Sequence, residues 1–231
     1  MKRVLLKLSG EALASQEEIY NAPFVDDVAS GLYRAVREGY ELAVVVGAGN
    51  IWRGRSGGEM DRTTADYMGM LATVINALYL KDALIRQGAD AVVLTSVPMS
   101  PFAEAYTPDL AKKYLSEGRI VVLGSGLGIP FLSTDTAGAV RAAEIGADMM
   151  LMAKNIPFVY TADPRLDPTA TILAKVSCTE ILAKNLGAID AAAAAFCRSV
   201  KMPIRFFGMQ TGADVLAALA GQKEGTLVLA E

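Results

Sequence analysis

Short apolar runs alternate along the chain with longer segments in which apolar residues recur every three or four positions. The spacing in the longer segments predicts a helix over 25–36 and a long helix from about Arg62 to Arg86. Ser133-Thr134 is a typical N-cap signal for a further helix that continues to Glu144. The short runs have the length and composition of buried strands, and they cover 4–8, 42–46, 91–94, 120–123, 149–152, 204–207 and 226–229.

This alternation also predicts the fold class. Alanine-rich segments with high helix propensity precede the last two strands. Continuously apolar strands interleaved with helices are typical of a mainly parallel sheet that is covered on both faces. No linker, charge block or internal repeat divides the chain. We therefore expect one domain over residues 1–231, built as a three-layer α/β/α sandwich.

Three strands are followed by turns that contain glycine, at 7–11, 47–54 and 124–128. In open α/β sheets, ligands bind beyond the carboxyl ends of the strands. Glycine lets the backbone approach a ligand and turn N–H groups toward an anion, and Lys7 and Arg53 add full positive charge. One turn alone is most often a tight strand-to-helix connection. Three together, two of them carrying basic residues, favour a polyphosphate site.

Carboxylates lie near these turns, and each also has an ordinary structural interpretation. Asp66 and Asp135 fall in the first turns of predicted helices, where they stabilise the helix dipole. Asp163 precedes a proline, a pair that commonly starts a turn. None of the three identifies a site by itself.

Composition removes several classes of function. The chain has 231 residues, two cysteines, no histidine and a formal net charge of −3. Catalysis that uses imidazole, whether in a Ser-His-Asp triad or a Cys-His dyad, is therefore excluded, as is an imidazole metal site. A slightly acidic chain is a poor candidate for sequence-independent nucleic-acid binding. Two isolated cysteines, Cys178 and Cys197, suit reduced thiols in the cytoplasm.

No targeting or membrane segment is expected either. Lys7 interrupts the apolar run near the start, so no signal-peptide core forms. The longest uncharged stretch, 120–134, contains glycines and a proline and is too short to span a bilayer. The P-loop motif is absent, and the first turn lacks the dinucleotide-binding glycine pattern.

Six motifs, taken together and in order, have the spacing of one family. They are KLSGEAL at 7–13, GAGNIWRG at 47–54, ADYMGMLATVIN at 65–76, PFLSTDTA at 130–137, TADPRLDPTA at 161–170 and EGTLV at 224–228. On these motifs the chain resembles the bacterial uridylate kinases (UMP kinases) of the amino-acid kinase superfamily. The resemblance covers nearly the whole chain.

The resemblance implies a sandwich with a sheet of about eight strands, a homohexamer, and phosphoryl transfer from ATP to UMP in pyrimidine nucleotide synthesis. Mg²⁺ would arrive with ATP, and no metal site made only of protein ligands is implied. The matched positions give Lys7 and Asp135 at the phosphoryl-transfer centre. They give ATP contacts at Lys7, Leu8, Ser9, Gly10, Gly49, Arg53, Lys154, Tyr160 and Asp163. They give UMP contacts at Ala48, Asp66, Leu127, Gly128, Ile129, Pro130, Phe131, Leu132, Ser133 and Thr134.

The chain departs from the family pattern at three places, of which Ala48 in place of the usual glycine is the mildest. Leu127 stands where a hydroxyl residue is usual, and Pro157-Phe158 replaces an Asp-Gly pair near the expected adenine site. A site that hydrogen-bonds a base loses discrimination when that partner is removed. Drift in a working kinase is the simpler interpretation. The alternatives are an amino-acid-kinase-fold protein with another small acidic acceptor, and a non-catalytic paralogue that binds a nucleotide or an anion, as in molybdenum storage. Whether Asp135 orients Lys7 or binds Mg²⁺ is left open.

Overall fold

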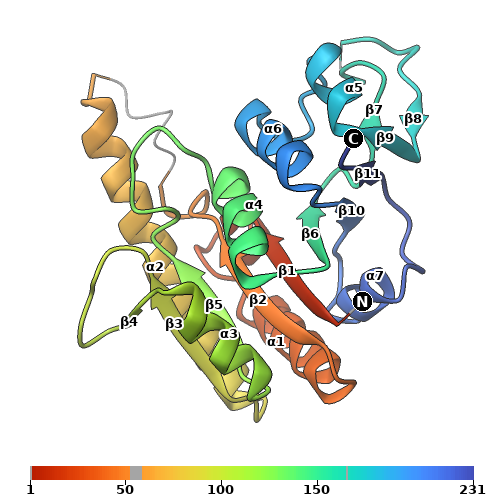
Figure 1. Cartoon of the computed structure of the whole chain (residues 1–231). Coiled ribbons are helices and arrows are strands. Elements are labelled where there is room, and N and C mark those ends of the chain that lie inside the picture. Colours follow the sequence, from red (N-terminus) through yellow and green to blue (C-terminus); the bar gives the residue numbers. More distant parts are fainter. Residues whose placement is uncertain (1, 53–58, 165) are drawn as a thin grey trace.

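A computed structural model describes residues 2–52, 59–164 and 166–231 (Figure 1). In these ranges the main sheet has nine strands in the order β4-β3-β5-β2-β1-β6-β10-β11-β9. All neighbouring strands run parallel except β10 and β11. The strands are β1 (Arg3–Leu8), β2 (Glu41–Val46), β3 (Ala91–Thr95), β4 (Glu104–Ala105), β5 (Ile120–Gly124), β6 (Met149–Lys154), β9 (Lys175–Ser177), β10 (Ile204–Gly208) and β11 (Leu227–Leu229).

Seven α-helices in the described ranges form the outer layers, together with one short 3-10 helix. Alternate strand residues face opposite sides, so Leu5 packs in one core while Val4 and Leu6 pack in the other. Helices α3–α6 cover the face of Leu5, and α1, α2 and α7 cover the face of Leu6. The helices are α1 (Ala22–Arg37), α2 (Arg62–Arg86), α3 (Pro108–Ser116), α4 (Thr134–Ile145), α5 (Cys178–Ala183), α6 (Ala191–Val200), α7 (Ala213–Leu219) and the 3-10 helix η1 (Gly10–Leu13).

Local sequence explains where several helices begin and end. Asn21 and Thr107 cap α1 and α3 through side-chain oxygens, and each helix has a proline in its first turn. Ser133 caps α4, as the sequence predicts. That helix ends at Gly146, whose φ of +69° is the left-handed conformation that glycine adopts without strain.

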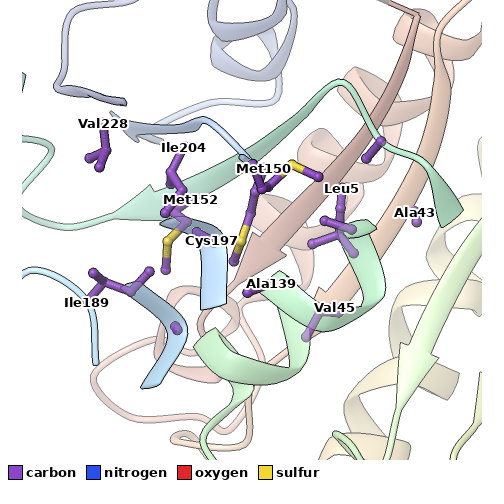
Figure 2. Close-up of a cluster of buried hydrophobic side chains, with 14 of the residues drawn as sticks. Leu5, Ala43, Val45, Ala139, Met150, Met152, Ile189, Cys197, Ile204 and Val228 are labelled. Carbon is purple, nitrogen blue, oxygen red and sulfur yellow. The ribbon is translucent and has the colours of Figure 1, made fainter. Parts of the chain in front are cut away.

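The core on the Leu5 face fixes the position of α4 over the central strands. Figure 2 shows Leu5 of β1 and Met150 of β6, which are register partners, near Ala139 of α4. A Cβ on Gly138 would lie 2.6 Å from the Met150 methyl group, so this glycine allows the close approach of helix and sheet. The start of α4 is thereby held at the carboxyl end of β1.

The three-layer architecture and the mainly parallel sheet are confirmed. The sheet has nine strands, one more than the resemblance implies. The long helix α2 begins at Arg62 and ends at Arg86, as the sequence predicts. The sequence patterns did not predict the short elements α3, α5, β4 and β9, nor the separate hairpin of β7 (Val159–Tyr160) and β8 (Ile172–Leu173). Two- and three-residue strands are too short to show a period.

One described helix, α2, is long and apolar enough to cross a membrane by length and composition alone, and 44% of that segment is buried inside the protein. Ala77, Leu80 and Leu84 of α2 lie in the core on the Leu6 face. A buried core helix passes the same test, so α2 alone is weak evidence for a membrane span.

Candidate active site

The carboxyl ends of four adjacent parallel strands, β5, β2, β1 and β6, lie along one edge of the sheet. The three glycine-rich turns leave β1, β2 and β5 at this edge. Lys7 comes next to last in β1, and Lys154 is the last residue of β6. Parallel pairing therefore brings together residues that are far apart in the chain, where ligands bind in open α/β sheets.

Asp135 joins the two lysines at the centre of this edge. Its Oδ1 lies 2.8 Å from Nζ of Lys7, and its Oδ2 lies 3.4 Å from Nζ of Lys154. The Lys7 side chain is 9% exposed and that of Asp135 is 15% exposed. Two ammonium groups share one carboxylate, so the cluster of Lys7, Asp135 and Lys154 carries a net positive charge suited to a phosphate group.

The charges in this cluster shift its pKa values. Burial alone would raise the pKa of Asp135, but the positive charges of Lys7 and Lys154 outweigh it and hold the pKa below its ordinary value. Burial lowers the pKa of Lys154, and its neighbour Lys7 lowers it further, against the opposing effect of Asp135. Asp135 is therefore an ionised partner for both ammonium groups.

The first two glycine-rich turns pack directly on each other. The Gly47 N–H donates to the Leu8 carbonyl at 2.8 Å. A Cβ on Gly10 would lie 2.5 Å from Oδ1 of Asn50 and 2.6 Å from the backbone nitrogen of Gly49. Because no side chain fits there, glycine at position 10 is what lets the two backbones meet beside Lys7.

Asn76, a fully buried residue of α2, holds the second turn in place. Its side-chain amide donates to the Gly47 carbonyl at 2.7 Å and to the Asn50 side chain at 2.7 Å. Its amide oxygen accepts a hydrogen bond from the Tyr20 hydroxyl at 2.8 Å. Buried amides are costly unless they are paired, so this set of bonds ties the turn rigidly to α2.

The third turn runs from β5 to α4 and has an unusual backbone. Ser125, Gly126, Gly128 and Phe131 all have positive φ, between 55° and 76°. For Ser125 and Phe131 this conformation is strained and needs support from the surroundings. Asp66 supplies part of it.

A hydrogen bond connects Asp66 of α2 to Phe131, beyond the end of the third turn. The Phe131 N–H donates to Oδ2 of Asp66 at 2.8 Å. Arg62, one helical turn before Asp66, lies 2.9 Å from the same carboxylate, and its guanidinium stands over the Phe131 ring. Asp66 therefore fastens the third turn to α2, beyond any effect on the helix dipole.

Two adjoining cavities open beside the lysine cluster. One has a volume of 590 Å³ and is lined by Lys7, Asp135 and Lys154 together with the segment from α5 to α6. The other, of 890 Å³, extends from Lys154 past Tyr160 and Asp163. They share Lys154 and residues 185–188. The cleft is thus large enough for a nucleotide that reaches from Tyr160 to the lysine cluster.

The structure brings seven of the predicted site residues together around the two cavities. The cavities contain Lys7, Ser133, Thr134, Asp135, Lys154, Tyr160 and Asp163. The side chain of Leu8 is buried in the core, so only its backbone belongs to the edge. Asp66, Phe131 and the 127–130 segment do not line these two cavities, and Asp66 of α2 accepts a hydrogen bond from the Phe131 N–H. Arg53 lies outside the described residues.

Several residues of the site were not predicted. Asp190 caps α6 and accepts hydrogen bonds from the hydroxyls of Ser133 and Thr136 on α4, the latter at 2.9 Å. An aspartate directly before an alanine run is an N-cap signal, so the sequence contained a signal for Asp190 as the start of α6. Four further residues hold the second and third turns through hydrogen bonds and carry no comparable local signal: Thr73, Asn76, Ser96 and Arg141.

The described residues offer little to hold a metal ion. Both carboxylate oxygens of Asp135 are paired with ammonium groups, and no cluster of three or more candidate ligands exists in residues 2–52, 59–164 and 166–231. A hard divalent cation needs several oxygen ligands. The donor set in the described residues therefore does not fit a metal held only by protein side chains.

Comparisons with known proteins agree with this geometry. The family model described as the amino acid kinase family matches residues 2–208. A uridylate kinase from Rhodococcus jostii is 44% identical over 228 residues, which cover 98% of this chain and 94% of that protein. The crystal structure of a UMP kinase from Bacillus anthracis aligns with a TM-score of 0.94 and 34% identity, covering 100% of this chain and 96% of the other.

A second crystal structure, of a UMP kinase from Ureaplasma parvum, aligns with a TM-score of 0.93 and 30% identity, covering 99% of this chain and 98% of the other. These matches extend over nearly the full length of both partners. They include the edge of the sheet that carries the lysine cluster. The chain therefore belongs to the amino acid kinase family, in the branch of the uridylate kinases.

Proposed function

We propose that this protein transfers the γ-phosphoryl group of ATP to UMP. A phosphate oxygen of UMP forms a bond to the γ-phosphorus while the bond from that phosphorus to the β,γ-bridging oxygen breaks. The electron pair leaves with ADP, and the products are ADP and UDP. The observation that supports this reaction best is the cluster of Lys7, Asp135 and Lys154, which lies between a nucleotide-sized cleft and the third glycine-rich turn.

Charge compensation is the main chemical task in this reaction, because the loose transition state needs positioning and electrostatics more than proton transfer. Lys7 neutralises negative charge on the transferred group and the bridging oxygen. Asp135 holds the Lys7 ammonium in place, and Lys154 adds a second positive charge. The attacking oxygen is already ionised at neutral pH, so no general base is needed, which suits a chain without histidine.

The two nucleotides occupy opposite ends of the edge in this proposal. ATP lies along the first two turns with its base in the larger cavity. Its contacts come from Lys7, Leu8, Ser9, Gly10, Gly49, Arg53, Lys154, Tyr160 and Asp163. UMP lies against the third turn, with Ala48, Asp66 and the segment 127–134. In this proposal the acceptor oxygen approaches the γ-phosphorus from the side opposite the bridging oxygen that leaves with ADP, as in-line transfer requires.

Mg²⁺ enters the proposed reaction bound to the phosphate oxygens of ATP. It supplies further charge neutralisation there. Because Asp135 is committed to Lys7 and Lys154, no step is assigned to a metal held by the protein.

We also propose a homohexamer. The face of α2 turned away from the core exposes Met68, Leu71 and Ile75, of which Leu71 is 54% exposed and Ile75 is 51% exposed. Clustered apolar side chains on one helix face are typical of a protein–protein interface. Burial in an assembly explains why so apolar a helix face persists.

The proposed setting is the bacterial cytoplasm, where UDP feeds pyrimidine nucleotide synthesis. Both cysteines are unpaired and buried, as suits a reducing compartment, and burial raises the pKa of Cys197 to about 12. ATP and UMP are the proposed partners, without nucleic acid or membrane.

The decisive experiment measures ADP formation by the purified protein with Mg-ATP and one acceptor at a time. UMP, CMP, dCMP and no acceptor are compared, and the assembly is checked by size-exclusion chromatography. Turnover that depends on UMP is the expected result. Folded protein that turns over another acceptor, or none, would refute the proposal, and metal analysis of the same sample would test the storage alternative.

A further inference from the structure

Arg141 is a buried charged residue of α4 that the proposed reaction does not use. It is 7% exposed, and its guanidinium lies 3.9 Å from the centre of the Tyr106 ring. Its Nη1 donates to Oε2 of Glu144 at 2.5 Å, and its Nη2 donates to the Ser96 hydroxyl at 2.8 Å. The Tyr106 hydroxyl donates to the same Glu144 oxygen at 2.8 Å. Burying a charge is costly unless it is fully paired, so this cluster holds the guanidinium in one orientation.

Ser96 connects Arg141 to the third glycine-rich turn through hydrogen bonds. This residue directly follows β3, and its hydroxyl donates to the Gly126 carbonyl at 2.6 Å. An arginine is only a donor, so a hydroxyl that accepts from Arg141 must direct its own proton elsewhere. Here the Gly126 carbonyl receives it. The result is a chain of two hydrogen bonds from Arg141 through Ser96 to the turn.

The backbone around Ser125 is held by further bonds. The Ser96 N–H donates to the Ser125 hydroxyl at 2.8 Å, and the Ser125 N–H donates to the Thr73 hydroxyl of α2 at 2.8 Å. A Cβ on Gly128 would lie 3.1 Å from the Cβ of Ser96, so the turn also packs closely on Ser96. Ser125 has a positive φ, a conformation that is strained for a residue with a side chain and needs such support.

We propose that Ser96 and Arg141 are positioning residues for the phosphoryl acceptor, setting the shape of the turn at 125–128 against which UMP binds. This inference rests on the proposed function and adds two residues to it. The pair lies on the β3 and β5 side of the edge, whereas the larger cavity lies on the β6 side, beyond β2 and β1. Loss of the bond between Ser96 and Arg141 therefore weakens the binding of UMP and leaves the binding of ATP unchanged.

The test uses Ser96→Ala and Arg141→Met in the full-length protein, with Tyr106→Phe as the matched control. Tyr106→Phe removes the hydroxyl bond to Glu144 but keeps the ring under the guanidinium and the bond to Ser96. For each variant, kcat, the KM for UMP, the KM for ATP and the melting temperature are measured.

We expect Ser96→Ala and Arg141→Met each to raise the KM for UMP by about tenfold, the effect of one charge-assisted hydrogen bond. The KM for ATP stays within about twofold, because distant sites behave independently. Tyr106→Phe leaves both values unchanged. The double variant is no worse than the more severe single variant, because both residues act through one chain of bonds.

Two other results would overturn the inference. An unchanged KM for UMP in folded Ser96→Ala protein removes the positioning role but leaves the kinase function standing. Equal increases in both KM values indicate a merely structural role. If the wild-type protein neither turns over UMP nor binds it in a calorimetric titration, the proposed function and this inference fail together. Ser96→Ala decides the matter alone if Arg141→Met does not fold.

Discussion

The ammonium nitrogen of Lys7, near the end of β1, lies 2.8 Å from Oδ1 of Asp135, in the first turn of α4. The packing of Gly138 and Ala139 on the central strands sets this distance. Since the second oxygen of Asp135 faces Lys154, the carboxylate orients two positive charges at once. The packing of α4 on the sheet therefore determines where the charges of the proposed reaction lie.

Replacing Lys7 by methionine removes the charge and keeps most of the side-chain volume. We expect kcat for UMP phosphorylation to fall by ~10²-fold or more, because Lys7 acts on charge that develops in the transition state. Asp135 keeps Lys154 as a partner, so the fold persists. Steady-state kinetics and thermal melting check this, with the exposed Lys113→Met as control. A kcat within severalfold of the wild type would contradict the proposed role.

Asp135→Asn keeps the shape of the side chain but leaves the buried Lys7 ammonium and the half-buried Lys154 ammonium without a counter-charge. At neutral pH we expect it to lower kcat and to reduce the free energy of unfolding by about 3 kcal/mol. The native pKa of Asp135 lies below its ordinary value, so on acidification the unfolded state takes up the proton first. The stabilisation is thus complete above the unfolded pKa and is lost as the pH falls through the native pKa.

Urea unfolding of wild type and Asp135→Asn at several pH values measures this difference. It should be constant from neutral pH down to about pH 5, and shrink only at lower pH. A difference that grows on acidification would show that the carboxylate is not stabilised by Lys7 and Lys154.

Asn76→Asp tests the attachment of the second turn to α2. A carboxylate cannot donate to the Gly47 carbonyl, so a buried acceptor loses its partner. We expect a loss of about 1–3 kcal/mol in unfolding free energy and higher KM values for both nucleotides. Tyr20→Phe removes only the bond to the amide oxygen and should show a smaller effect. If Asn76→Asp and the wild type had equal kinetic constants, the attachment of the second turn by Asn76 would have no role in substrate binding.

Leu127→Thr restores the hydroxyl that is usual in the family. The shape of the turn depends on positive φ values and on the bond from the Gly128 N–H to the Ser125 carbonyl, and neither involves the Leu127 side chain. We therefore expect the KM for UMP to change by less than about fivefold, the effect of one ordinary hydrogen bond. A much larger gain in affinity for UMP over CMP would instead mean that Leu127 alters acceptor specificity.

Ile75→Glu tests the proposed assembly. A charge at the centre of the exposed apolar face of α2 should dissociate the assembly into smaller species, because a buried unpaired carboxylate is costly at an interface. Size-exclusion chromatography with light scattering measures the mass of each variant. Val200→Glu, at a site with 41% exposure on α6, is the control and should keep the wild-type mass. An unchanged mass for Ile75→Glu would place the interface elsewhere.

Local patterns along the chain were sufficient for the central strands, the bounds of α2, the cap at Ser133 and the three glycine-rich turns. These features follow from side-chain periodicity and backbone preference, which act between near neighbours. The parallel order of β5, β2, β1 and β6 then brought the turns to one edge, as connectivity rules require.

Tertiary packing alone decided the contacts among residues distant in the chain. Asn76 and Arg141 sit in helices with no local sign of function, yet their side chains hold the second and third turns. The hydrogen bond between Asp66 and Phe131 likewise depends on how α2 lies beside the third turn. Such partners are set by the packing of whole elements, where a shift of one ångström makes or breaks a hydrogen bond.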